Sequence, residues 1–116
     1  MIFRRKVQHG NKIGRQLGFP TLNLTVGNFG NCHEAGVYVC HVKINDQWYK
    51  GALHFGPKKG SPYLTLEIHV IDFKKNIYGQ WISFRVVKKI RKPMSFKNWS
   101  DAKKRIQKDV EEIKNL

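Results

Sequence analysis

The sequence predicts a mainly β fold, a small antiparallel barrel or sandwich that is followed by one C-terminal α-helix. Three observations favour this class. Apolar and polar residues alternate with a period of two in several segments before residue 91, and runs of turn residues join these segments as hairpins. After Pro93 the apolar residues recur at helical spacing. Strands do not alternate with helices along the sequence, so a parallel sheet is not expected.

The predicted strands are short and follow one another closely. The first, over residues 3–7, leads into a glycine-rich segment and then into a second loop at residues 25–34. Alternating apolar positions, rich in β-branched and aromatic residues, predict four further strands, over residues 37–44, 48–55, 64–73 and 81–90. The third of these four has the clearest apolar face, formed by Leu64, Leu66, Ile68 and Val70.

A single helix is predicted near the C-terminus, from Ser100, whose side chain is expected to cap it, to about Asn115. Apolar residues at helical spacing define the side that covers the β core: Ala102, Ile106, Val110 and Ile113. Opposite charges four residues apart are expected to pair on the exposed side, Arg105 with Asp109 and Lys108 with Glu112. The helix is therefore interpreted as structural.

The composition is that of one globular domain. The 116 residues are 41% hydrophobic and 26% charged, which is ordinary for a folded protein, so we expect a single domain over residues 1–116. No apolar run approaches the ~18 to 20 residues that a membrane helix needs. No apolar stretch follows the basic N-terminus, as it would in a signal peptide. We therefore expect a cytoplasmic monomer without a membrane partner.

The formal net charge of +14 is the most unusual property of the composition. A basic domain attracts polyanions in general, so the charge favours nucleic-acid binding and phosphate chemistry about equally. Together with aromatic residues interleaved among the cations, it supports one alternative interpretation, a basic β-barrel that binds nucleic acid without catalysis. The other interpretation is that much of the charge is an ordinary solvated surface.

Two cysteines are too few for a disulfide framework, which is typical of proteins in a reducing compartment. Each cysteine precedes a histidine, in the pairs Cys32-His33 and Cys40-His41, but this spacing fits no zinc pattern. Neighbouring residues on a strand point to opposite faces, so Cys40 and His41 are not expected to share a metal ion.

The segment at residues 10–23 combines glycines, a cation, a rigid proline and two short oxygen-bearing side chains. Such a segment can bring backbone amides, the Thr21 hydroxyl and the Asn23 amide oxygen close to a phosphate or its metal ion. The glycine spacing matches neither a P-loop nor a dinucleotide-binding fingerprint. Ordinary turn glycines are the alternative, but the ending Pro20-Thr21-x-Asn23 favours the phosphate site.

Glu67 is the residue that the pattern favours most for catalysis. It is expected mid-strand on the polar face, beside His69, in a chain with eight acidic residues. This position suits a general base. The alternative is a solvent-facing carboxylate with no catalytic role, and the pattern by itself leaves both interpretations open.

Several motifs occur in a fixed order along the chain: Gly10-x-x-x-Gly14-Arg15-x-Leu17-Gly18-Phe19-Pro20-Thr21-x-Asn23-Leu24, Gly36-Val37-Tyr38, Leu66-Glu67-Ile68-His69 with Asp72-Phe73, Ile77-Tyr78-Gly79, Ile90-Arg91 with Phe96, and a helix with Ile106 and Asp109. As a set they resemble the ATP-dependent riboflavin kinases (flavokinases) of bacteria and eukaryotes, almost from end to end. The resemblance implies a six-stranded antiparallel Greek-key β-barrel with a C-terminal helix. It also implies transfer of the ATP γ-phosphoryl group to the 5′-hydroxyl of riboflavin, which gives FMN and ADP.

The resemblance also implies roles for single residues. Thr21 and Asn23 would hold Mg²⁺ and the phosphates, and Glu67 would take the proton from the attacking hydroxyl. Two further sets are implied, a loop over the phosphates (Gly14, Arg15 and Gly18) and the loops on the flavin side (Tyr78, Gly79 and Arg91).

The chain departs from the family pattern after the second hairpin strand. The family commonly has Asn-Ile-Gly-x-Arg-Pro-Thr there, whereas residues 54–59 read His-Phe-Gly-Pro-Lys-Lys. The lost Pro-Thr leaves open the nucleotide preference, and with it a degenerate member that binds flavin without turnover. Many bacterial members also have an N-terminal adenylyltransferase domain. This sequence has no counterpart, so we expect a kinase-only protein or an excised domain.

Overall fold

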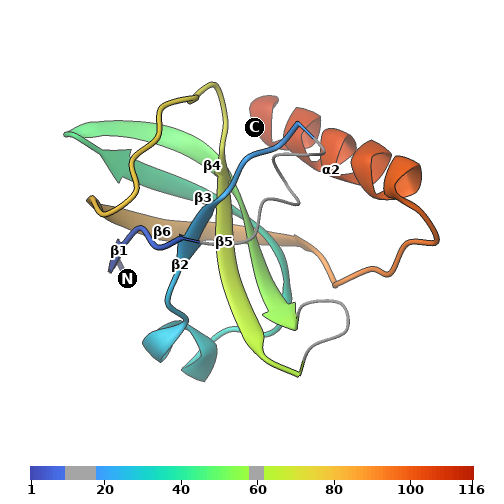
Figure 1. The fold of residues 1–116 in the computed structure, drawn as a ribbon, viewed down its shortest axis with the longest axis horizontal. Coiled ribbons are helices and arrows are strands. Elements are labelled where there is room, and N and C mark those ends of the chain that lie inside the picture. Colours follow the sequence, from blue (N-terminus) through green and yellow to red (C-terminus); the bar gives the residue numbers. More distant parts are fainter. Residues whose placement is uncertain (10–17, 58–61) are drawn as a thin grey trace.

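The computed structural model describes residues 1–9, 18–57 and 62–116, which form an antiparallel β-barrel with one long helix against it (Figure 1). The elements are β1 (Phe3–Lys6), β2 (Leu22–Leu24), the 3₁₀ helix η1 (Gly27–Asn31), β3 (Gly36–Ile44), β4 (Gln47–Pro57), β5 (Leu64–Val70), β6 (Trp81–Arg91) and α2 (Trp99–Lys114). In this described part of the chain, no helix is long and apolar enough to cross a membrane.

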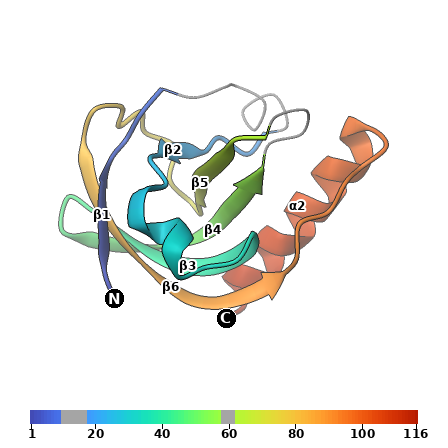
Figure 2. The same cartoon turned by 90° about the horizontal axis from the view of Figure 1, so that it is seen from below.

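The six strands form one antiparallel sheet in the spatial order β1-β6-β3-β4-β5-β2. Strands β3, β4 and β5 are neighbours in chain order and β6 returns to lie beside β3, which is the Greek-key arrangement. The Gln8 amide, just after β1, donates a hydrogen bond to the Asn23 carbonyl oxygen in β2 at 2.8 Å. This bond joins the two edges, so the barrel is nearly closed and α2 lies outside the ring (Figure 2). The predicted Greek-key barrel is confirmed.

Two apolar clusters hold the molecule together. The larger one fills the barrel, and its fully buried members include Phe29, Leu53, Ile68 and Phe84. The smaller one lies between the outer face of β3 and β4 and the helix, and its buried members are Val39, Ala52, Ile71, Val110 and Ile113. Strands β3 and β4 are therefore covered on both faces where the helix crosses them, which confirms that the helix caps the β core.

The alternation of apolar residues correctly predicts β3 to β6 but does not predict β2. A strand of three residues is too short to show a period of two. The expected loop at residues 25–34 contains η1, which places Phe29 in the core. β5 ends at Val70, earlier than expected, and the chain then turns at Asp72, whose φ is +59°.

The helix α2 begins one residue before the predicted cap. The side chain of Asn98, and not that of Ser100, accepts a hydrogen bond from the Asp101 amide at 2.9 Å. Asn98 has an extended backbone and Ser100 lies within the first helical turn, so Asn98 occupies the N-cap position.

Asp109 lies on the barrel side of α2 and is fully buried, so the expectation of an exposed pair with Arg105 is wrong in its location. The two residues do pair, with Arg105 Nε 3.2 Å from Asp109 Oδ1. Asp109 follows Ile106 by three residues and precedes Ile113 by four, which puts it on the apolar stripe that faces the barrel.

Candidate active site

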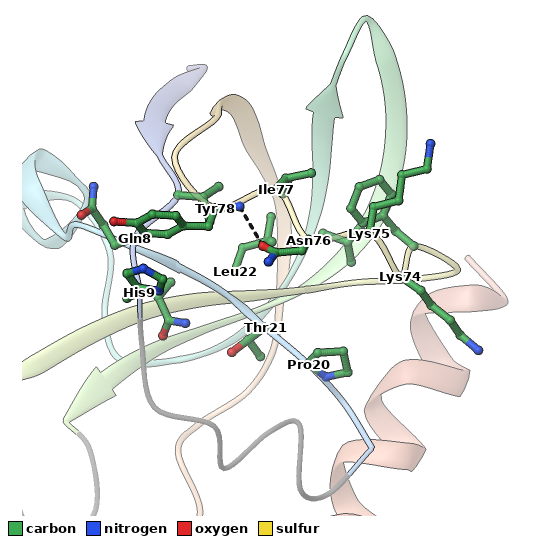
Figure 3. A pocket seen from close by; sticks show the side chains of 14 residues that line it. Gln8, His9, Pro20, Thr21, Leu22, Lys74, Lys75, Asn76, Ile77 and Tyr78 are labelled. Atoms are coloured by element: carbon green, nitrogen blue, oxygen red, sulfur yellow. Dashed lines mark hydrogen bonds between the residues drawn. The ribbon is translucent and has the colours of Figure 1, made fainter.

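A pocket of about 490 Å³ opens at one end of the barrel, between segments that lie far apart in the sequence (Figure 3). Its walls come from the residues after β1, the segment that enters β2, and the connection from β5 to β6. The lining residues are Val7, Gln8, His9, Pro20, Thr21, Leu22, Asn23, Val70, Phe73, Lys74, Lys75, Asn76, Ile77 and Tyr78. This volume is within the range of small-molecule sites.

The pocket combines aromatic and cationic walls. The His9 and Tyr78 rings stack, with centroids 3.4 Å apart and planes 20° apart. In the view of Figure 3, Lys74 and Lys75 lie at the other end from this stack. The Asn76 side-chain oxygen accepts a hydrogen bond from the Tyr78 amide at 3.0 Å, which fixes the turn that presents the ring. An anionic ligand with a planar group suits such a pocket.

The segment that contains Thr21 is attached to the barrel by His69, the neighbour of Glu67 on the polar face of β5. The Nδ1–H of His69 donates to the Pro20 carbonyl oxygen at 2.8 Å, and its ring meets Phe19 edge to face. Burial lowers the pKa of His69, although the bond to Pro20 acts in the opposite direction. His69 therefore acts as a neutral anchor for this segment.

Asn23, Glu67 and His54 form a row across three strands. Asn23 in β2 is paired in register with Glu67 in β5, and Glu67 is paired with His54 in β4. Residues directly opposite each other in an antiparallel sheet share a face and have Cβ atoms about 5 Å apart. The flanking Leu66 and Ile68 fill the barrel, so the row lies on the outer face. The register thus places Glu67 beside Asn23, which is one of the pocket-lining residues.

His54 is held neutral at the end of this row. Burial lowers the pKa of His54 to about 4, with a further lowering by the Arg91 guanidinium that the Asp109 carboxylate opposes. The neutral imidazole adds no positive charge beside Glu67, and it offers one donor and one acceptor nitrogen.

The lowered pKa of His54 predicts a loss of stability in acid. The unfolded chain takes up this proton near pH 6.5 and the folded chain near pH 4, so between these values the unfolded state binds more protons. Stability therefore falls as the pH drops through this window, by up to about 3 kcal/mol for this side chain. Urea unfolding at pH 7 and pH 4.5 should show a smaller loss for His54→Asn than for the wild type. Equal losses would contradict the assignment.

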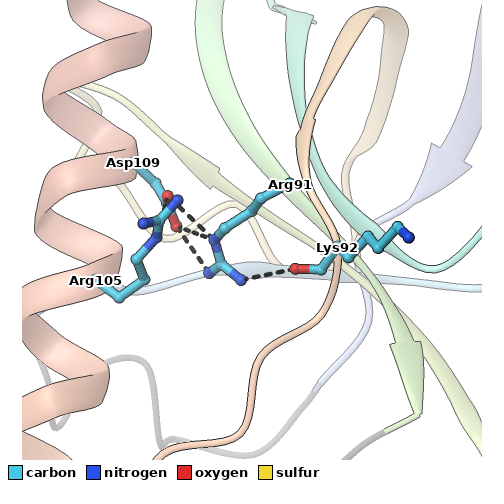
Figure 4. Close-up of polar contacts among 4 residues, drawn as sticks. All are labelled: Arg91, Lys92, Arg105 and Asp109. Atoms are coloured by element: carbon cyan, nitrogen blue, oxygen red, sulfur yellow. Dashed lines mark hydrogen bonds and ion pairs between the residues drawn. The ribbon is translucent and has the colours of Figure 1, made fainter.

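Arg91 faces α2. Its guanidinium donates to both Asp109 carboxylate oxygens, from Nη2 to Oδ2 at 2.8 Å and from Nε to Oδ1 at 3.2 Å (Figure 4). Arg105 contacts the same carboxylate from the helix, and Arg91 Nη1 donates to the Lys92 carbonyl oxygen. The Arg91 side chain is 10% exposed. Its contacts tie the end of β6 to α2.

A sequence model of the family described as "Flavokinase: Riboflavin kinase" matches residues 1–116. The chain belongs to this family. Among flavokinase relatives, the bifunctional riboflavin kinase/FMN adenylyltransferase of Haemophilus influenzae is 38% identical over 112 residues, which are 94% of this chain and 36% of that protein. The RNA-binding riboflavin kinase RibR of Bacillus subtilis is 36% identical over 107 residues, which are 90% of this chain and 46% of that protein.

The chain thus spans between a third and a half of the length of these two relatives. Among solved flavokinase structures, the riboflavin kinase from Trypanosoma brucei superposes with a TM-score of 0.70 at 26% sequence identity. The match covers 98% of this chain and 77% of the other. This similarity extends over the barrel and the helix together.

The fold brings together some of the residues that the flavokinase motifs single out. Thr21, Asn23 and Tyr78 line the pocket, and Glu67 is next to Asn23. Gly79 lies next to the pocket, where its φ of +81° and the hydrogen bond that its N–H donates to the Val7 carbonyl oxygen shape the turn. Gly18 has a φ of +86°, which favours glycine at this position. Arg91 does not line the pocket, because its side chain faces α2. The predicted site residues Gly14 and Arg15 lie outside the described residues.

Sequence reasoning missed four groups at or near this site. His9, Lys74 and Lys75 line the pocket from loops, where no periodic pattern marks a position as inward or outward. His54 stands at the position where the family commonly has asparagine, and this departure could have identified it. In addition to these four, the burial of Asp109 was not predicted, although its spacing of three residues from Ile106 places it on the apolar side of the helix.

Proposed function

We propose that this chain is a riboflavin kinase domain that transfers the γ-phosphoryl group of ATP to the 5′-hydroxyl of riboflavin. The main support beyond the family is that Thr21 and Asn23 line a pocket with cationic walls, and that Glu67 is paired in register with Asn23. Phosphoryl transfer depends mostly on positioning and on charge neutralisation, so a site with few reactive groups suffices.

In this proposal Glu67 accepts the proton of the riboflavin 5′-hydroxyl as its oxygen attacks the γ-phosphorus. The bond from that phosphorus to the bridging oxygen breaks, so that FMN and ADP are formed. Lys74 and Lys75 attract the phosphates into the pocket, and the His9–Tyr78 stack offers a wall for a planar ring.

Thr21 and Asn23 are the residues that would hold Mg²⁺. Both offer hard oxygen donors at the pocket wall, and among the described residues no group of three or more His, Cys, Asp or Glu side chains is placed to hold a metal ion. Such a sparse donor set fits Mg²⁺, which keeps several waters. When bound, Mg²⁺ would neutralise charge on the phosphates.

The proposed metal role predicts a changed dependence on Mg²⁺. Asn23→Ala removes one oxygen donor, so the Mg²⁺ concentration for half-maximal FMN formation should rise at least about tenfold. Asn23→Asp retains an oxygen at the same place and should need less Mg²⁺ than the alanine variant. An unchanged Mg²⁺ dependence in Asn23→Ala would remove Asn23 from this role.

The reaction itself is tested by incubating the chain with riboflavin, Mg²⁺ and one nucleoside triphosphate at a time, and by separating FMN chromatographically. Formation of FMN is expected with ATP, and the comparison of nucleotides measures the preference that the altered loop after Phe55 leaves open. Folded protein that forms no FMN with any donor would overturn the proposal. A flavin fluorescence titration then identifies a binder without turnover.

The alternative drawn from the charge, a nucleic-acid-binding barrel without catalysis, has less support, because the family match extends over the whole chain. We further propose a monomer in the cytoplasm with small-molecule substrates. Size-exclusion chromatography of the chain tests the oligomeric state.

A further inference from the structure

One outer face of the barrel is both basic and aromatic, and the proposed kinase site does not use it. We call it the basic–aromatic face and define it by its outward side chains: Arg4 and Lys6 of β1, Trp81 and Arg85 of β6, His41 and Lys43 of β3, and Trp48 of β4. The residues between them fill the barrel, which fixes this set as outward. None of the seven lines the pocket.

The register brings these side chains together across four adjacent strands. Lys6 is opposite Trp81, His41 is opposite Arg85, and Lys43 is opposite Trp48. Trp81 and Trp48 lie on strands that are separated by β3, hence about 10 Å apart across the sheet. The face thus presents two indole rings on one rigid surface.

Each tryptophan is exposed and lies next to a cation. Trp81 is 55% exposed and the Arg4 guanidinium lies 4.5 Å from its ring centroid. Trp48 is 46% exposed, and the Arg85 guanidinium lies 5.2 Å from its ring centroid. Guanidinium groups over indole rings are themselves planar surfaces on which a base can stack.

His41 keeps Arg85 in place without adding charge. Arg85 Nη2 donates to His41 Nδ1 at 3.3 Å, so that nitrogen is unprotonated. Burial lowers the pKa of His41, and the charges of Arg85 and Lys50 lower it further. A neutral acceptor at this position orients the guanidinium that covers Trp48.

The face is also strongly positive. Strands β1, β3, β4 and β6 contain no aspartate or glutamate, and Asp46 lies in the turn that joins β3 and β4. The chain has a formal charge of +14, far more than a nucleotide-binding pocket needs. Cations that follow a backbone together with exposed aromatic rings are typical of surfaces that bind single-stranded nucleic acid.

We infer that the basic–aromatic face binds single-stranded nucleic acid, in addition to the proposed kinase activity at the pocket. The cations contact phosphates and the two tryptophans with their guanidinium partners stack on unpaired bases. Single strands fit better than a duplex, whose bases are stacked on one another and out of reach of a flat surface. An anionic membrane would use the charge but has no rings to stack on the indoles.

The test measures fluorescence anisotropy of labelled RNA and DNA strands of about 12 nucleotides, within the ~4 to 16 that an OB-fold barrel binds. Lys6→Gln with Lys43→Gln should weaken binding at least tenfold and flatten the plot of log affinity against log salt by about 1.4, for two phosphate contacts. Trp48→Ala with Trp81→Ala should weaken binding about tenfold and leave that slope unchanged. Urea midpoints establish that each variant is folded.

The matched control is Lys104→Gln with Lys108→Gln, which removes the same charge from exposed positions of α2. It should change binding less than threefold. Equal weakening by the control would overturn the proposal, because it would show that net charge alone attracts the strand. Equal affinity for a duplex of the same sequence, or binding to phosphatidylserine vesicles with none to oligonucleotides, would also overturn it. These measurements need no catalysis, so they are independent of the kinase assay.

Discussion

Replacing Glu67 by glutamine is expected to lower the rate of FMN formation by about 100- to 10,000-fold, the range that general-base groups contribute. The glutamine amide has nearly the same shape but accepts no proton, so the riboflavin hydroxyl must attack without a base. Glu67 and Asn23 are opposite in register, and the substitution leaves this backbone pairing intact. Binding of riboflavin and the urea midpoint should therefore change little.

Two further variants separate the proposed proton transfer from a general effect of charge. Glu112→Gln removes a carboxylate from an exposed position of α2 and should leave turnover unchanged. Glu67→Asp keeps the carboxylate but withdraws it by one methylene, so it should retain more activity than the glutamine variant. If Glu67→Gln turns over at a rate close to that of the wild type, another group must accept the proton.

The sequence predicted the parts of the fold that repeat with a period. Strands β3 to β6 have long alternating patterns, and the stripe from Ile106 to Ile113 has a helical one. The strand β2 was not predicted, because its three residues are held in place by pairing with β5 and by the hydrogen bond from the Gln8 amide to the Asn23 carbonyl oxygen. Those are long-range contacts, which no local pattern encodes.

The same distinction applies to the candidate site. The types of residue at Thr21, Asn23 and Glu67 were evident from the motifs, but their proximity depends on the register between β2 and β5. The flavin-side role of Arg91 stays a prediction, but the motif did not indicate the contacts of its side chain. The side chain could extend from the end of β6 in either direction, and the buried carboxylate of Asp109 draws it towards α2.

Removal of the Asp109 carboxylate should be the most destabilising of the substitutions considered, because it leaves two guanidinium groups without their anion. Asp109 has no exposed surface, and the side chains of Arg91 and Arg105 are 10% and 24% exposed. Breaking a buried ion pair by removing one partner typically costs about 3 to 5 kcal/mol. Urea unfolding of this variant should therefore show a lower midpoint.

A double substitution distinguishes the cost of an unpaired charge from a net contribution of the ion pair. Arg91→Met with Asp109→Leu replaces the two most buried members of this cluster by apolar side chains between β6 and α2 and leaves the more exposed Arg105 in place. Replacement of a buried ion pair by apolar side chains is often neutral or stabilising. We expect the double variant to recover most of the stability that Asp109→Ala loses. Glu111→Ala, an exposed carboxylate two residues along the same helix, is the control and should change the midpoint little. If the double variant is as unstable as Asp109→Ala, the ion pair itself stabilises the packing of α2 on the barrel.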